Sequence, residues 1–167
     1  MDSAKTEDRP LLEVLRLGSQ SHQETHALQQ ELIEKRAAGS IRDPLILVEH
    51  EPVITVGRGA DLQAFCSSDL PVVEVERGGE ATYHGPGQLV GYPILDLNRL
   101  DLRLHGYLRW LEARVLETLD HFGLRGQRDE EATGVWIDGD QGLRKIAAMG
   151  VRVSRWVSMH CQKPLWA

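Results

Sequence analysis

The chain has 167 residues, of which 41% are hydrophobic and 26% charged, a composition typical of one globular domain and not of a disordered chain. Its net charge of -6 argues against nonspecific nucleic-acid binding, and no apolar run approaches the length of a bilayer span. The polar, acid-containing first ten residues differ from a secretory or organellar leader, so we expect a cytoplasmic protein without membrane or nucleic-acid partners.

The first part of the chain predicts strands and one polar helix. Residues 11–17 alternate well enough for a strand, and the glycine-serine pair at 18–19 offers a turn and a cap for a helix through about Ala38. Residues 44–56 predict two strands with a bend at Pro52, because proline interrupts a central ladder but suits a turn.

A glycine-rich segment occupies the middle of the chain. Residues 72–76 and 89–95 alternate as strands do, and residues 77–88 join them. Glycines let backbone N–H groups approach a ligand closely, and Arg77 and His84 are interleaved with them. A glycine-rich connection without a ligand is the alternative, but these two side chains favour a binding loop.

The second half predicts a long helix followed by strands. Apolar residues recur at steps of three and four over 102–122, and Gly123 follows as a terminator. Residues 133–138 and 143–160 predict strands, joined by a hairpin turn at 138–140. Strands with two interposed helices predict an α+β domain in which helices pack on a mixed β-sheet.

Lys145 falls on the more apolar face of its predicted strand. On a regular strand it shares that face with Leu143, Ala147 and Met149. Partial burial would disfavour the charged ammonium and let the amine exchange protons with a nucleophile. A lysine that extends its charged end to water fits the pattern equally well, and Gly150 could bulge the strand and change its face.

Residues 77–88 read Arg-Gly-Gly-Glu-Ala-Thr-Tyr-His-Gly-Pro-Gly-Gln. The series resembles the signature of the lipoyl(octanoyl) transferase family of lipoate biosynthesis at every signature position. Residues 133–136 and 144–160 resemble the second and third blocks of that family, in the same order. The resemblance implies a single octanoyltransferase-like catalytic domain over residues 1–167, with the fold of biotin and lipoate protein ligases.

The resemblance also implies a reaction without metal or other cofactor. An octanoyl group passes from octanoyl-acyl carrier protein, through a cysteine thioester, to lipoyl domains of 2-oxoacid dehydrogenases and to the glycine cleavage H protein. Lys145 matches the lysine that lowers the pKa of the nucleophilic cysteine. The implied acyl-binding pocket consists of Arg77, Gly78, Gly79, Glu80, Ala81, Thr82, Tyr83, His84, Ala148, Met149 and Gly150.

The sequence departs from the family near its end. The family's cysteine lies in a Pro-Cys-Gly segment, and no such segment occurs here. Residues 161–167 resemble no part of the family, so we expect a domain without its C-terminal part and a loss of activity. Cys161 is a poor surrogate, because its neighbour His160 would point to the opposite face of a strand. Cys66 fits a small apolar filler.

Two other functions are compatible with the sequence. An ATP-dependent biotin or lipoate ligase shares the fold, although the Gly-Pro-Gly-Gln continuation disfavours it. A noncatalytic protein that binds acyl chains or lipoyl domains is the second alternative. Two groups of basic residues are candidates for docking an acidic carrier: Arg99, Arg103, Arg109 and Arg114, or Arg144, Lys145, Arg152 and Arg155. Histidines without partners at ligand spacing are expected to be surface or satisfied core residues, namely His22, His26, His50, His105 and His121.

Overall fold

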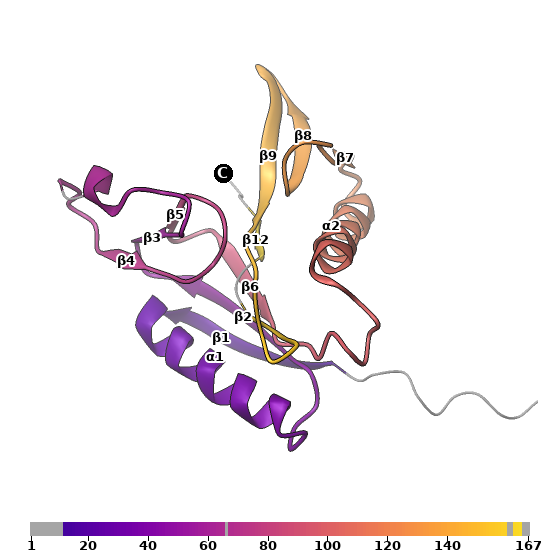
Figure 1. Ribbon diagram of the computed structural model, residues 1–167. Coiled ribbons are helices and arrows are strands. Elements are labelled where there is room, and N and C mark those ends of the chain that lie inside the picture. The colour runs from indigo at the N-terminus through magenta and orange to yellow at the C-terminus, as the bar shows by residue number, and fades with distance from the viewer. Residues whose placement is uncertain (1–11, 66, 160–161, 165–167) are drawn as a thin grey trace, which may run out of the picture.

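In the computed structural model, which describes residues 12–65, 67–159 and 162–164, one large sheet collects strands from the whole chain. Its seven strands lie in the order β1-β2-β6-β12-β9-β8-β7 (Figure 1). They are β1 (Glu13–Gln20), β2 (Pro44–His50), β6 (Leu89–Pro93), β7 (Gly126–Gln127), β8 (Val135–Gly139), β9 (Gly142–Met149) and β12 (Gln162–Pro164). The β1–β2 pair is parallel and the other pairs are antiparallel, so the predicted mixed sheet is confirmed.

A second, three-stranded sheet carries the glycine-rich segment. In it β3 (Val53–Val56) lies between β4 (Val72–Glu74) and β5 (Ala81–His84). A short 3-10 helix, Leu62–Phe65, interrupts the connection between β3 and β4. The segment 77–88 was predicted as one open loop, and this is wrong because β5 lies inside it. Pairing with β3 therefore fixes the backbone of residues 81–84, one third of the predicted binding loop.

Helix α1 (His22–Ala37) begins later than predicted and packs with a polar face. Strand β1 continues past Gly18, so Ser21 caps the helix, its Oγ accepting the Glu24 N–H. The buried residues of α1 are His22, Thr25, Gln29, Ile33 and Arg36. This helix therefore cannot rely on apolar burial alone to hold its place.

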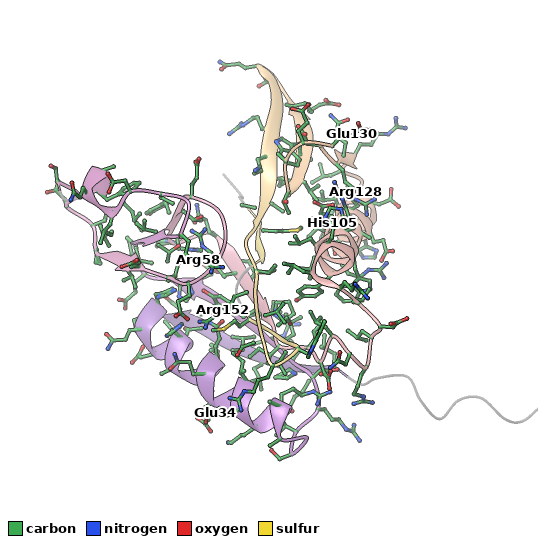
Figure 2. All side chains as sticks on the ribbon, in the orientation of Figure 1. Glu34, Arg58, His105, Arg128, Glu130 and Arg152 are labelled. Atoms are coloured by element: carbon green, nitrogen blue, oxygen red, sulfur yellow. The ribbon has the colours of Figure 1, made fainter. Side chains whose placement is uncertain are left out.

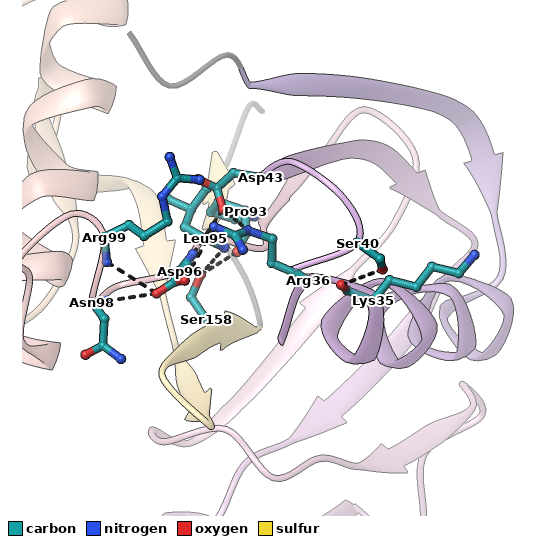
Figure 3. A network of polar contacts seen from close by, with 10 residues as sticks. All are labelled: Lys35, Arg36, Ser40, Asp43, Pro93, Leu95, Asp96, Asn98, Arg99 and Ser158. Atoms are coloured by element: carbon teal, nitrogen blue, oxygen red, sulfur yellow. Dashed lines mark hydrogen bonds and ion pairs between the residues drawn. The ribbon is translucent and has the colours of Figure 1, made fainter. Parts of the chain in front are cut away.

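A buried ion-pair cluster fixes the end of α1 to the large sheet (Figure 3). Arg36 is 4% exposed, its Nε donates to Asp43 Oδ1, and its Nη2 lies 3.5 Å from Asp96 Oδ2. Asp43 also accepts the Asp96 backbone N–H at 3.1 Å. Two carboxylates offset the desolvation of one guanidinium, which explains how a helix with few apolar contacts stays on the sheet.

Helix α2 (Leu104–His121) lies beside β7, β8 and β9 (Figure 1) and ends as predicted. Gly123 follows at φ +73°, a conformation that glycine adopts without a steric penalty. Leu119 packs with Val135 and Ala147 of the β8–β9 hairpin. In the described part of the chain neither helix combines the length and the apolarity that a membrane crossing requires. Two helices on mixed sheets confirm the α+β class.

The strand predicted over residues 143–160 is three strands. After β9 the chain leaves the large sheet at Gly150 and forms a hairpin of β10 (Arg152–Ser154) and β11 (Val157–Met159). The turn of this hairpin holds Arg155 and Trp156 at φ +50° and +64°. The break at Gly150 places residues 148–151 opposite the small sheet, where the site forms.

Candidate functional site

One cavity of about 690 Å³ lies between the small sheet, the end of β9 and the first turns of α2. It brings together every residue of the predicted pocket: Arg77, Gly78, Gly79, Glu80, Ala81, Thr82, Tyr83, His84, Ala148, Met149 and Gly150, with Lys145. It also includes Leu104, Leu108, Thr133 and Val151, which were not singled out from the sequence. The two leucines belong to the apolar stripe of α2. The sequence periodicity predicts that this stripe packs in the core, whereas in the structure Leu104 and Leu108 are not buried and line the cavity.

Arg77 is a buried structural centre of the cavity wall. Its Nη2 donates to the Thr55 carbonyl, the Thr55 hydroxyl and the Thr82 hydroxyl at 3.0, 3.1 and 2.7 Å. These bonds connect β3 to β5, and Nη1 donates to Gly78 O at 3.1 Å. A Cβ on Gly150 would lie 3.0 Å from Arg77 Cδ, so this glycine lets the residue-148–151 segment approach the arginine. Arg77 thus contacts both the small sheet and the residue-148–151 segment, which are the two walls of the cavity.

His84 belongs to a cluster of histidine rings that sequence spacing did not reveal. His22, His50 and His84 come from α1, β2 and β5, and their ring centroids lie 5.4 to 6.4 Å apart. His50 contacts the Tyr92 hydroxyl at 2.7 Å and the Gln20 carbonyl at 3.0 Å. The three rings meet only because their elements meet in the fold, so His22 and His50 do have partners in three dimensions.

Burial controls the charge of this cluster. It lowers the pKa of His22 to about 4, with a further contribution from the neighbouring His50, His26 and Arg77. Burial likewise lowers the pKa of His50 and of His26. His22 and His50 are therefore uncharged at neutral pH. Among the residues that the structure describes, no three His, Cys, Asp or Glu side chains are arranged to hold a metal ion.

Of the two interpretations of Lys145, partial burial is wrong and a charged end that reaches water is confirmed, because the lysine is exposed while lining the cavity. Trp136 pairs with Lys145 and Val135 with Ala147, so one extra residue, Ile146, bulges from β9. The bulge puts Lys145 and Ala147 on opposite faces, with Ala147 in the core. Gly150 is not the residue that changes the face.

Contacts nevertheless restrain the Lys145 ammonium. Its Nζ donates to the Thr133 carbonyl at 3.3 Å and lies 4.5 Å from the centroid of the Trp136 ring. The cation is thus held at the wall of the cavity and keeps access to water. Cys66 and Cys161, the two thiols of the sequence, lie outside the described residues.

Ion pairs neutralise part of both groups of basic residues considered for carrier docking. Arg109 pairs with Glu112, and Arg114 with Glu117. In the other group Arg152, labelled in Figure 2, pairs with Glu76.

Comparisons with known proteins identify the family. Residues 21–162 match the lipoyl protein ligase A/B catalytic domain. An octanoyltransferase of Gloeobacter violaceus is 51% identical over 135 residues, covering 79% of this chain and 59% of that protein. An octanoyltransferase of Geobacter metallireducens is 44% identical over 144 residues, covering 86% of this chain and 66% of that protein. The chain thus spans about three fifths of the length of these relatives.

Solved structures share the fold at low sequence identity. LipL1 of P. falciparum, in complex with lipoate, aligns at a TM-score of 0.68 and 16% identity, over 92% of this chain and 47% of that one. A bi-partite lipoate protein ligase from Thermoplasma acidophilum aligns at 0.65 and 19% identity, over 92% of this chain and 60% of that one. The ligase-like fold and the resemblance to octanoyltransferases are both confirmed. The chain belongs to the lipoyl protein ligase A/B catalytic domain family.

Proposed function

We propose that this chain provides the acyl-binding cavity of an octanoyltransferase, the reaction of which moves an octanoyl group from octanoyl-acyl carrier protein to the lysine of a lipoyl domain. One observation carries the proposal: residues 77–84 and 148–150, which we call the two signature segments, come from different sheets and line a single cavity together with Leu104 and Leu108. Its volume of about 690 Å³ suits a small ligand, and the leucines provide apolar surface for an alkyl chain. The octanoyltransferase names of the relatives support the choice of acyl group.

The proposed transfer has two steps. A cysteine thiolate attacks the carbonyl carbon of the carrier thioester, and the carrier leaves as a thiol after taking up a proton. The uncharged lysine amine of the lipoyl domain then attacks the acyl-enzyme, forming an amide, losing a proton and releasing the cysteine. A cation at Lys145 would stabilise the thiolate in both steps. Since this sequence has no Pro-Cys-Gly segment, the 167-residue chain should bind the acyl group without retaining it covalently.

Calorimetry tests the binding of octanoate, and intact-mass measurement tests whether an acyl-enzyme forms. We expect octanoate to bind and octanoyl-carrier to leave no octanoyl adduct on the chain. Leu108→Arg, inside the cavity, should abolish octanoate binding, whereas Leu124→Arg, at an exposed site outside it, should not. Absence of octanoate binding by the folded chain would refute the acyl-binding proposal. An adduct on Cys161 would instead show that this cysteine can serve as nucleophile.

An ATP-dependent lipoate ligase is the second candidate, because the fold also matches a lipoate-protein ligase A bound with ATP, at a TM-score of 0.60 and 15% identity. Octanoate-dependent exchange between ATP and pyrophosphate would select it, since the thioester route uses no nucleotide. Tight binding of octanoate or a lipoyl domain by this chain, with neither exchange nor octanoyl transfer in an acylation assay, would select a noncatalytic binder.

A further inference from the structure

Glu112 is a buried carboxylate that the proposed chemistry does not use. It lies in the middle of α2 and is fully buried. Its Oε2 lies 2.8 Å from Arg109 Nη1 and 3.3 Å from Arg128 Nε. Arg128, labelled in Figure 2 beside α2, also donates to the Arg109 carbonyl at 3.1 Å. Two guanidinium groups therefore compensate the desolvation of the buried carboxylate.

The second oxygen of Glu112 reaches the lysine through one peptide unit. Oε1 accepts the backbone N–H of Gly134 at 3.1 Å. The carbonyl of that same peptide unit belongs to Thr133 and accepts Lys145 Nζ at 3.3 Å. A peptide unit is planar and stiff, so a bond that fixes its N–H also fixes the direction of its carbonyl. A carboxylate acceptor further polarises the unit and strengthens the carbonyl as an acceptor.

Trp136 and Gly134 border the side chain of Lys145. The Trp136 ring lies 4.5 Å from Nζ. A Cβ on Gly134 would lie 3.3 Å from Lys145 Cε and 2.6 Å from the Ala147 carbonyl oxygen. Because Gly134 has no side chain, both the Lys145 side chain and the β9 backbone can lie close to it. The Thr133 carbonyl then binds the charged end of Lys145.

We propose that Glu112 is a positioning residue for Lys145, acting through the Thr133–Gly134 peptide unit to hold the ammonium at the cavity wall. That the position of the Lys145 ammonium matters for catalysis rests on the proposed function. The position itself can be measured independently of that function. A residue that merely tethers α2 to the β8–β9 hairpin would affect stability and leave the lysine where it is. The two roles can therefore be separated by a readout specific to Lys145.

Reductive methylation with ¹³C-formaldehyde supplies that readout. The sequence has only four lysines, Lys5, Lys35, Lys145 and Lys163, and Lys145→Arg assigns one dimethylamine signal. A dimethylated amine keeps one N–H for the Thr133 carbonyl. In the wild-type chain the ring current of Trp136 should shift the Lys145 methyl signal upfield of the Lys35 signal. Glu112→Met keeps the length of the side chain but removes both acceptors, and should abolish most of that shift.

Matched variants complete the experiment. Glu117→Gln alters an exposed carboxylate of the same helix and should leave the Lys145 signal in place. A folded Glu112→Met chain with an unmoved Lys145 signal would overturn the proposal, whatever its melting temperature. Glu112→Gln keeps an acceptor for Gly134 and should retain most of the shift. If Glu112→Met does not fold, Glu112→Ala decides, because it removes both acceptors with a smaller side chain. A folded Glu112→Ala chain with an unmoved signal overturns the proposal. Failure of octanoate binding would leave this result intact and count only against the proposed function.

Discussion

The rings of His22, His50 and His84 occupy the junction of α1 with both sheets, where a charge would be poorly solvated. Each ring contributes a titratable group within 5.4 to 6.4 Å of the next. The pKa of His22 is about 4 because burial and the neighbouring positive groups disfavour its protonation. Protonation of His22 in the folded protein is therefore unfavourable, and the stability of the junction depends on pH.

Stability should fall as the solution is acidified through this range. Between about pH 6.5, the ordinary pKa of histidine, and about pH 4, the unfolded chain binds a proton at His22 that the folded protein does not. The contribution of His22 is thus fully present above pH 6.5 and decreases toward pH 4, by up to about 1.4 kcal/mol per pH unit for each such group. Urea unfolding at several pH values measures this slope.

Two variants test whether His22 causes the pH dependence of the unfolding free energy. His22→Phe removes the titrating group and should flatten the dependence of the unfolding free energy on pH. His105→Gln, at an exposed position of α2, should leave it unchanged. An unaltered slope in His22→Phe would show that other groups control the acid sensitivity.

At the scale of elements, the β8–β9 hairpin depends on the missing side chain of Gly134. This glycine has φ +141°, and a Cβ there would lie 2.6 Å from the Ala147 carbonyl oxygen, a backbone atom that cannot rotate away. Gly142, the first residue of β9, also has a positive φ, +105°, but a Cβ there would meet no atom within 4 Å. A side chain at Gly142 would thus meet only the cost of the positive φ angle, whereas a side chain at Gly134 would also collide with a backbone atom.

Replacing each of these glycines by alanine should give unequal losses. Gly142→Ala is expected to cost about 1 kcal/mol of unfolding free energy for its backbone conformation, and Gly134→Ala about 2 kcal/mol more, because β9 must shift as well. Urea unfolding of both variants provides the comparison. Equal losses would mean that the contact with Ala147 relaxes freely and that Gly134 is required only for its φ angle.

The same hairpin shows what the sequence could and could not predict. The period of α2, its end at Gly123 and the turn between two strands are local patterns, and the structure contains all three. The bulge at Ile146 arises from pairing with β8, so a regular alternation assigned Lys145 to the wrong face. Strand β5 was missed because glycines on either side of it read as a loop. The pocket residues came from family resemblance, since no periodicity connects residues 77–84 with residues 148–150.

At the scale of the whole molecule, the cavity joins two sheets that share no strand. The small sheet contributes β5 and the segment before it, and the large sheet contributes the end of β9. Arg77 and Gly150 provide the close approach between these parts, because a Cβ at Gly150 would lie only 3.0 Å from Arg77 Cδ and 3.2 Å from the Gly78 carbonyl oxygen. A ligand in this cavity should therefore couple the stability of the two sheets.

Hydrogen exchange can test this coupling directly. At an octanoate concentration of 100 Kd, binding should stabilise the closed state by about 2.7 kcal/mol, which slows exchange about 100-fold wherever opening releases the ligand. We expect the amides of Thr82 and Tyr83 in β5 and those of Ala148 and Met149 in β9 to be protected together. Acetate at the same concentration is the matched control, because it has the carboxylate but no alkyl chain. Protection confined to β5 would mean that the ligand contacts one sheet only, and that the two signature segments do not form a single acyl site.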